Sequence, residues 1–153
     1  MKRKIVLMVL CLAFALVGCG TEQTEAPDAG FVQVVNPLVT VESVEEMEEK
    51  LGYSVPVLDK DVESYIVLVI DGVCESGRIR YADGSDFNIK EGSGDISGIY
   101  GGVLETEENV HGVAVSFYVY EELRYAIWEK DGFTYSLTGG AALSADVAAL
   151  LSQ

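Results

Sequence analysis

The sequence predicts an α+β domain, in which a mostly antiparallel sheet of about six strands carries an N-terminal helix and a short C-terminal helix. Three observations lead to this class. Short β-branched and aromatic segments follow one another with Asp-Gly turns, a capped amphipathic helix precedes them, and a second helical pattern closes the chain. We expect this single domain to span residues 31–153, after a leader at 1–18 and a tether at 19–30.

The chain begins with a basic and apolar leader. Three positive charges at positions 2–4 precede thirteen consecutive apolar residues at 5–17. A membrane-spanning helix needs about 20 apolar residues, because each residue adds only about 1.5 Å across the hydrocarbon core. The basic start and the short apolar run therefore predict a secretory signal peptide.

The end of the leader, Leu16, Val17, Gly18 and Cys19, resembles the signal-peptidase box of bacterial lipoproteins. The resemblance implies that the Cys19 thiol receives a diacylglyceryl group, that the leader is cut before it, and that the new amino terminus is acylated, with a fatty acid such as palmitate. Two or more acyl chains, at about 0.8 kcal/mol per buried methylene, anchor a protein stably. The alternatives are cleavage at the small residues 13–15, which gives a soluble secreted protein, or an uncut leader.

The lipoprotein interpretation predicts an extracytoplasmic location in the cell envelope. Lipid on Cys19 would hold the protein at the outer face of the cell membrane. In a host with two membranes the outer membrane is expected instead, because Gly20 rather than Asp follows the cysteine.

The mature chain is strongly acidic. All 25 acidic residues follow the leader, whereas only seven of the ten basic residues do, so its net charge is −18. Such a surface repels nucleic-acid backbones and anionic lipid headgroups. We therefore expect no nucleic-acid partner, and we expect the lipid rather than the polypeptide to contact the membrane.

The tether and the first helix follow the cysteine. Residues 20–30 are polar and nearly free of apolar side chains, which predicts disorder. Ser43 and Glu46 form a capping box before the amphipathic segment 44–51, and Gly52 supplies a stop. These signals predict a helix over 44–51.

Six strands are expected after this helix. They span residues 65–70, 78–81, 87–89, 111–120, 124–130 and 133–137. The first is fully apolar and β-branched, which is typical of a central strand covered on both faces. A three-residue loop at 83–85 would place Ile79 opposite Ile89 and would leave Arg78 and Arg80 on the other face.

The last hairpin provides the candidate binding surface. A two-residue turn at 131–132 pairs Trp128 with Tyr135 and gathers Trp128, Phe133 and Tyr135 on one face. This aromatic face could receive a ligand, and ordinary packing is the alternative interpretation. Ser144 is expected to cap the closing helix.

Residues 128–137, followed by the helix start at 143–144, resemble the end of an uncharacterised extracytoplasmic family, a domain of unknown function. The segment 52–56 resembles its entry, so the resemblance covers about residues 44–152. It implies a membrane-tethered α+β domain, distantly similar to the curved sheets of lipoprotein carriers and envelope-stress sensors. The family has no established catalytic residues, so none is transferred to this chain.

The sequence contains few groups for catalysis or metal binding. Removal of the leader and lipidation of Cys19 leave Cys74 as the only thiol, and His111 is the only histidine. A zinc site or a histidine-based triad therefore has too few groups. The glycine-rich segment 92–102 lacks the lysine of a phosphate loop. We expect no catalytic residue, no metal and no cofactor.

Acidic clusters are the remaining candidates for chemistry. Oxygens of Asp83, Asp86 and Asn88 could face a calcium ion, but they do not have the spacing of a known calcium loop. Glutamates within 105–108 and 121–122 could supply paired carboxylates for acid–base catalysis. Solvated strand edges are the alternative interpretation of these glutamates.

Two classes of function remain. The favoured one is a non-catalytic, lipid-tethered binding or interaction module that receives an envelope protein, a peptide or a lipid. The alternative is a carboxylate-dependent envelope hydrolase, which needs a cleft with facing acidic side chains and at least one of them buried. A purely structural envelope protein is a third possibility, which the sequence does not separate from the first.

Overall fold

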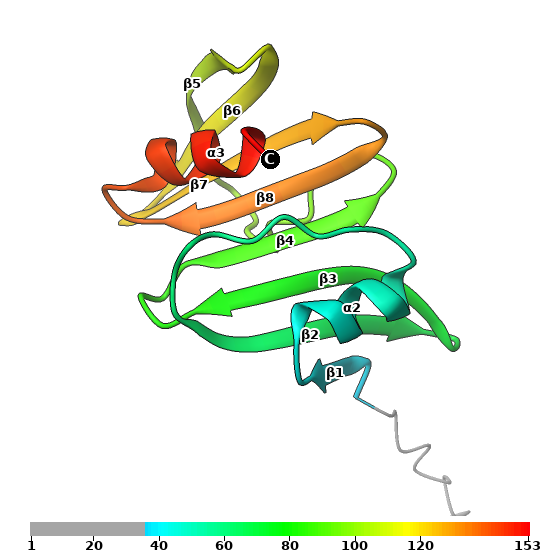
Figure 1. The fold of residues 1–153 in the computed structure, drawn as a ribbon. Helices are drawn as coiled ribbons and strands as arrows, with labels where there is room; N and C mark the ends of the chain where they lie inside the picture. The colour runs from blue at the N-terminus through cyan, green and yellow to red at the C-terminus, as the bar shows by residue number, and fades with distance from the viewer. Residues whose placement is uncertain (1–35) are drawn as a thin grey trace, which may run out of the picture. The chain divides into compact units, whose positions relative to one another are not determined.

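The computed structural model describes residues 36–153, so the predicted leader, Cys19 and tether lie outside the described part. Eight strands form one antiparallel sheet that carries two short helices (Figure 1). In chain order the elements are β1 (Leu38–Val41), α2 (Val44–Leu51), β2 (Val62–Ile70), β3 (Val73–Tyr81), β4 (Asp86–Glu91), β5 (Val103–Val110), β6 (Val113–Tyr120), β7 (Leu123–Lys130), β8 (Phe133–Gly139) and α3 (Leu143–Leu151).

Two four-stranded meanders make up the sheet. Its strand order is β1-β2-β3-β4-β8-β7-β6-β5, and the meanders meet where β4 pairs with β8. Asp71, His111 and Asp131 each precede a glycine in a hairpin turn, and both residues of each pair have positive φ. Turns of this kind match the right-handed twist of the flanking strands. His111 is therefore an exposed turn residue, as its sequence context indicates.

One face of the sheet, here called the helix face, packs against α2 and α3. Ile79, Phe87 and Leu137 lie on it and are fully buried. A Cβ at Gly77 would lie only 2.9 Å from Leu51 Cδ1, so the missing side chain lets α2 approach β3 closely. The buried hydrophobic core consists of residues between 41 and 151, so the described domain contains its own core.

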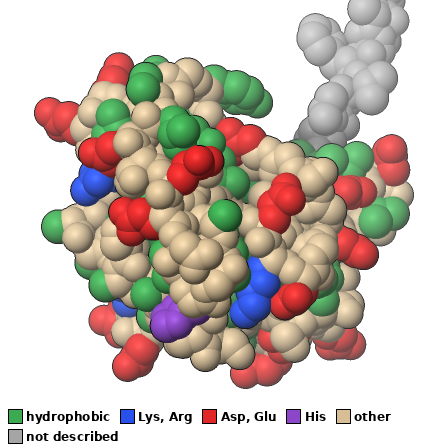
Figure 2. Space-filling view, turned by 90° about the horizontal axis from the view of Figure 1, so that it is seen from above, with side chains coloured by type: hydrophobic (Ala, Val, Ile, Leu, Met, Phe, Trp, Pro, Cys, Tyr) green, Lys and Arg blue, Asp and Glu red, His purple; other side chains and the backbone are tan. Residues whose placement is uncertain are grey.

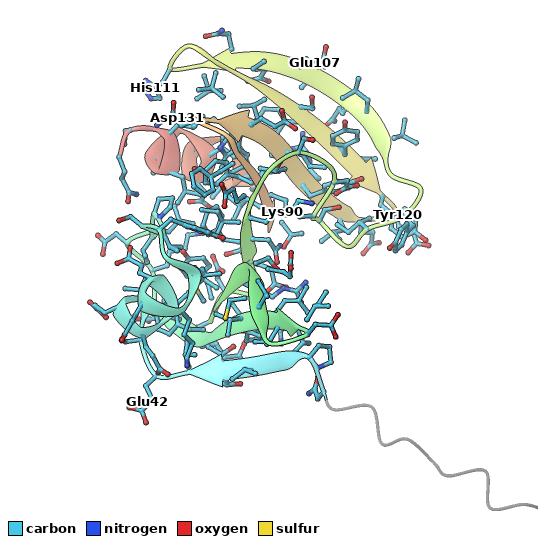
Figure 3. All side chains as sticks on the ribbon, turned by 90° about the vertical axis from the view of Figure 1, so that its right-hand side faces the viewer. Glu42, Lys90, Glu107, His111, Tyr120 and Asp131 are labelled. Atoms are coloured by element: carbon cyan, nitrogen blue, oxygen red, sulfur yellow. The ribbon has the colours of Figure 1, made fainter. Side chains whose placement is uncertain are left out.

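The opposite face, here called the groove face, carries a row of paired residues across the sheet. The row runs from Ile66 through Arg78, Asn88 and Ser136 to Ile127. Residues 92–102, the crossing segment, leave β4 in the middle of the sheet and reach β5 at its edge. In Figure 3 this segment lies on the side of the sheet away from the helices.

The predicted α+β class with about six strands is wrong, because residues 36–153 are β-rich and form eight strands. The six predicted strands correspond to β2, β3, β4, β6, β7 and β8, and the sequence analysis missed β1 and β5. Strand β1 has only four residues, and β5 carries Glu105, Glu107 and Glu108 because it is an exposed edge strand. Neither segment therefore shows the apolar alternation that identifies a half-buried strand. The predicted helix over 44–51 is confirmed, although β1 precedes it.

Three local predictions, on the position of β2, on the β3–β4 loop and on the cap of α3, also differ from the structure. Strand β2 lies next to the edge rather than at the centre, and only Val67 is fully buried on it. Four residues, 82–85, lie between β3 and β4, and Ile79 pairs with Phe87 rather than with Ile89, so the predicted three-residue loop at 83–85 is wrong. Since this shift is two residues, the faces remain as predicted. Ser144 does not cap α3, because Ala142 occupies the N-cap position without a side-chain bond.

The predicted pairing of the last hairpin is confirmed. Lys130 pairs with Phe133, and Trp128 pairs with Tyr135. One half of the predicted capping box of α2 is present, because the Glu46 amide donates to Ser43 Oγ at 3.3 Å, while Glu46 Oε2 accepts from the Glu42 amide at 2.9 Å rather than from that of Ser43. These features are set by residues close together in the chain.

Candidate functional site

The predicted aromatic residues meet on the helix face. Trp128 is 3% exposed and Tyr135 is 9% exposed, whereas Phe133 is half-buried. The rings of Trp128 and Tyr135 stack with centroids 5.4 Å apart, and Phe133 tilts against Tyr53 at 4.7 Å. A pocket of about 280 Å³ between residues 54–56 and the end of α3 reaches Trp128 and Tyr135. The structure thus brings the three rings together but places them in packing contacts, and their binding role stays a prediction.

A groove of about 370 Å³ lies on the groove face, between β1–β4 and the crossing segment. Its aliphatic lining consists of Leu38, Ile66, Leu68, Ile70 and Ile96. Leu38 and Ile70 are 47% and 49% exposed, and the other three side chains are half-buried. The groove therefore presents a continuous group of aliphatic side chains to solvent.

Arg78 lines the groove and is held by two buried polar residues. Its Nε donates to Asn88 Oδ1 at 2.7 Å, and Asn88 Nδ2 donates to Ser136 Oγ at 3.1 Å. Asn88 and Ser136 are buried, so their polar groups need protein partners, and these hydrogen bonds supply them. Within residues 36–153, the terminal amino groups of the Arg78 guanidinium donate no hydrogen bond to another side chain or to the backbone.

Lys90 supplies a second cation to the groove. It lies where β4 leads into the crossing segment (Figure 3). A Cβ on Gly94 would lie 3.7 Å from Lys90 Nζ, so the ammonium group lies against the crossing segment. In the described part of the chain Lys90 forms no ion pair, unlike Lys60 and Arg80.

These cations stand out because the surface is acidic. The described part has seven Lys and Arg residues against 22 Asp and Glu residues. Figure 2 shows acidic side chains spread over the molecule seen from above, with few basic ones among them. Two carboxylates, Glu75 and Asp95, also line the groove, and Asp95 Oδ1 accepts a hydrogen bond from the Ser97 amide at 2.7 Å.

The far end of the crossing segment rests on Tyr125. A Cβ on Gly102 would overlap the Tyr125 hydroxyl, so only glycine allows this approach. Tyr125 is buried and stacks on Tyr118 with ring centroids 5.1 Å apart. Burial raises the pKa of Tyr125, and the negative charge of Asp95 adds to this effect. The crossing segment is thus packed against the groove face at this end.

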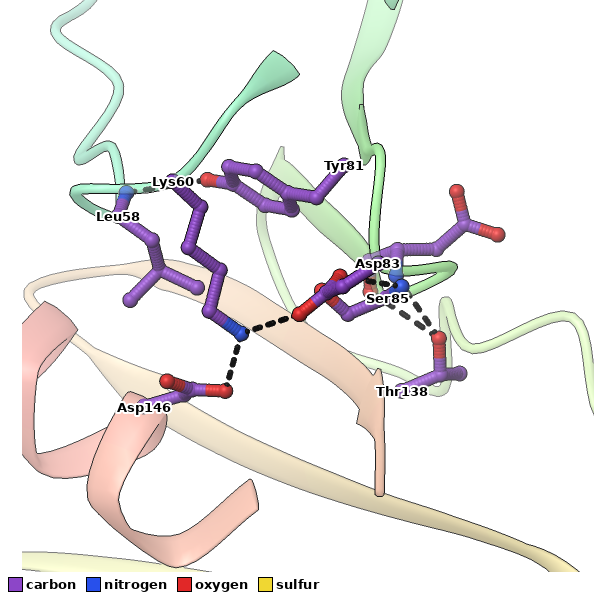
Figure 4. A network of polar contacts seen from close by, with 8 residues as sticks. Leu58, Lys60, Tyr81, Asp83, Ser85, Thr138 and Asp146 are labelled. Atoms are coloured by element: carbon purple, nitrogen blue, oxygen red, sulfur yellow. Dashed lines mark hydrogen bonds and ion pairs between the residues drawn. The ribbon is translucent and has the colours of Figure 1, made fainter. Parts of the chain in front are cut away.

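Lys60 joins the β3–β4 loop to helix α3 through two ion pairs (Figure 4). Its Nζ lies 2.8 Å from Asp83 Oδ2 and 2.6 Å from Asp146 Oδ2. The hydrogen bond from Lys60 lowers the pKa of Asp83, and bonds from Ser85 add to the effect. Partial burial lowers the pKa of Lys60, but the bonds to Asp146 and Asp83 outweigh it, so the net shift is upward. Because the charges of Lys60, Asp83 and Asp146 are paired with one another, this network stabilises the contact between the β3–β4 loop and α3.

The oxygens considered for calcium do not converge. Asp83, Asp86 and Asn88 each accept a hydrogen bond from a different basic side chain. Within the described residues, no group of three or more His, Cys, Asp and Glu side chains has the arrangement of a metal site.

An envelope hydrolase of the kind considered above requires a buried carboxylate, and the described residues do not provide one. No Asp or Glu among residues 36–153 is buried. The glutamates within 105–108 lie on edge strand β5, where Glu105 pairs with Arg124, and residues 121–122 form an exposed turn. Cys74 is a free, half-buried thiol.

The lipoprotein box, Leu16, Val17, Gly18 and Cys19, lies outside the described residues. Neither helix of residues 36–153 has the length and apolar character that crossing a bilayer requires. The predicted lipidation of Cys19 therefore stays a prediction.

The groove could not be identified from the sequence. The available signals were the position of Arg78 and Arg80 on the face away from the core and the glycines of residues 92–102. The route of the crossing segment depends on the distance between β4 and β5 in the sheet, and the sequence pattern does not specify that distance.

Comparisons of the chain with models of protein families, with curated proteins and with solved structures find no match. The resemblance at residues 128–137 stays a prediction, and the groove is the feature from which function can be argued.

Proposed function

We propose that the mature chain is a lipid-anchored, extracytoplasmic binding protein without catalytic activity, and that its groove holds an elongated apolar ligand. One observation supports this proposal above the others: aliphatic side chains from β1, β2 and the crossing segment line one solvent-open groove. Ligand sites are typically concave and mostly apolar, with a few polar groups that fix orientation.

The energetics favour an apolar occupant. Covering apolar surface gains about 25 cal/mol per Å², and the exposed parts of Leu38 and Ile70 are available for such covering. Polar groups that fix an orientation are present in Arg78, Asn88 and Lys90. An apolar ligand would therefore gain burial without displacing any core contact of the helix face.

Binding can be tested with N-phenyl-1-naphthylamine, a neutral fluorophore that brightens in apolar sites. The protein is the chain from Gly20 onward, made without leader and lipid, so that no acyl chain of its own competes. We expect saturable binding that the exchange Leu68→Ser weakens about tenfold, because one aliphatic contact is lost.

The matched control is Val73→Ser. Val73 is 59% exposed at the β2–β3 turn and does not line the groove, so this variant should bind like the wild type. Ile96→Ser provides a second groove variant on the crossing segment, away from the sheet. Absence of saturable binding, or equal binding by all three variants, would contradict the proposed function.

Anchoring is tested separately. Mass spectrometry of the protein from its own membranes should show a chain that begins at Cys19 and carries acyl groups. The exchange Cys19→Ser should abolish the modification and the membrane association. A chain that begins at Leu16 without lipid would overturn the anchor and would leave the groove proposal intact.

A further inference from the structure

The charges of the groove bear on the nature of its ligand. Within residues 36–153, three of the seven Lys and Arg side chains form no ion pair: Arg78, Lys90 and Lys130. Two of them, Arg78 and Lys90, line the groove. In a protein with such an excess of acidic residues, cations without partners beside an apolar groove favour an anionic group on the ligand.

Arg78 is oriented for such a group. The bond from Nε to Asn88 fixes the guanidinium, and Ser136 in turn fixes Asn88. The two terminal amino groups are left as a fork, the arrangement that binds a carboxylate or a phosphate with two parallel hydrogen bonds. Because the buried residues hold the side chain in place, little rotamer entropy is lost on binding.

The margin of the groove limits the charge of the anion. Glu75 and Asp95 also line it, and neither is buried. Their carboxylates repel a multiply charged head more strongly than a singly charged one. A monoanion such as a carboxylate therefore fits the groove better than a polyanion.

The sheet also argues for an alkyl chain over a peptide. Strands β2, β3 and β4 are internal, and their backbone groups pair with neighbouring strands. A peptide that lay across them would find backbone partners only at edge strand β1 and in the crossing segment, and burying amides that stay unpaired is costly. An alkyl chain has no such groups. The volume of about 370 Å³ lies near the lower end of the range of ligand pockets, which suits a single chain.

We infer that the groove binds a single-chain amphiphile with a carboxylate head group, with the chain against Leu38, Ile66 and Leu68 and the carboxylate on Arg78 and Lys90. This inference rests on the proposed function of the groove and adds the chemical class of the ligand.

The test is displacement of N-phenyl-1-naphthylamine by decanoate below its micelle concentration, by decan-1-ol below its solubility limit, and by butanoate. We expect decanoate to displace the probe at concentrations about tenfold or more below those of decan-1-ol, because charged hydrogen bonds add to the chain contacts. Butanoate, with the same head and a short chain, should not displace it.

The variants are Arg78→Gln and Lys90→Gln, with Lys130→Gln as the matched control. Lys130 is the last residue of β7 and likewise lacks an ion pair, but it lies on the helix face. Arg78→Gln should weaken decanoate about tenfold, and Lys90→Gln should weaken it several-fold, while decan-1-ol is unaffected. Lys90→Gln is informative even if Arg78→Gln disturbs Asn88, because Lys90 forms no hydrogen bond in the described part.

Each of the other possible outcomes would overturn a specific part of the inference. Equal displacement by decanoate and decan-1-ol would overturn the anionic head but keep the apolar groove. Displacement by butanoate would indicate a free-anion site and overturn the amphiphile. Preferred binding of a leucine-rich peptide with a free carboxyl terminus, over its amidated form and over decanoate, would replace the alkyl chain. Failure of the probe itself to bind would contradict the proposed function, not the head group alone.

Discussion

The two faces of the sheet are built from the same strands but have different contents. On the helix face, Trp128, Phe87 and Leu137 pack beneath the helices and exclude water. On the groove face, Asn88 and Ser136 are also buried, but they are polar and are satisfied by one another. The helix face thus stabilises the domain mainly through apolar burial, and the groove face depends on hydrogen bonding.

This difference explains where a ligand can bind. The helix face is covered by the protein's own segments, because α2, α3 and residues 53–61 lie over it. The crossing segment covers only part of the groove face and leaves Leu38 and Ile70 exposed beside Arg78. A ligand on the helix face would have to displace core contacts, whereas one in the groove would add contacts.

The largest effect is expected from Trp128→Ala. Trp128 and Ile127 are neighbours on β7, but Trp128 lies in the core and Ile127 lies half-buried on the groove face. Trp128→Ala should lower the free energy of unfolding by about 3–5 kcal/mol, because it opens a cavity. Ile127→Ala should cost clearly less. Urea denaturation measures both, and equal losses would contradict the division of roles between the faces.

A smaller effect is expected from Asn88→Ala. The exchange leaves the Ser136 hydroxyl and Arg78 Nε without their partner, which should cost about 1–3 kcal/mol of unfolding free energy. The control is Ser116→Ala, in the same row of the sheet, where a half-buried hydroxyl donates to Glu107. Thermal denaturation should show a near-neutral control. If both variants melt like the wild type, the buried hydrogen-bonded row contributes nothing to stability.

The smallest effect concerns Asp83, which belongs to neither face. Lys60 lowers its pKa, so the pair contributes stability above the unfolded-state pKa of about 4 and loses it as pH falls through the folded-state value. The side chain is 50% exposed, so Asp83→Asn should cost at most about 1 kcal/mol at neutral pH. The difference from the wild type should shrink below about pH 4.

Urea denaturation at several pH values measures this dependence. Asp59→Asn, at an exposed carboxylate without an ion pair in the described part, is the control and should leave the pH profile unchanged. A cost for Asp83→Asn that is constant from neutral to acidic pH would show that the ion pair is not its cause.

Much of the local structure could be predicted from the sequence because its causes are local. Ser43 and Glu46 specified the start of α2, and the turn at 131–132 specified the register that pairs Trp128 with Tyr135. Strands β1 and β5 could not be predicted in this way. Strand β1 has only four residues, too few for a periodic pattern, and β5 is an exposed edge strand with three glutamates, so its sequence resembles that of a loop.

The candidate site illustrates the same limit. The alternation of β3 and β4 put Arg78 on the face opposite Ile79, and that prediction is confirmed. The sequence also gathered Trp128, Phe133 and Tyr135, but it left open whether their face was solvent-exposed. Helix α3 and residues 54–56 pack there, and this packing joins segments far apart in the chain.

By itself the sequence determined which side chains share a face, where α2 begins and ends, and how the hairpin at 131–132 turns. These features depend on φ/ψ preferences and on a two-residue period within short segments. Only the tertiary structure decided that β4 pairs with β8, that the helices cover one face, and that residues 92–102 cross the other. Strand pairing and coverage depend on contacts between distant segments, whose free energy no local pattern contains.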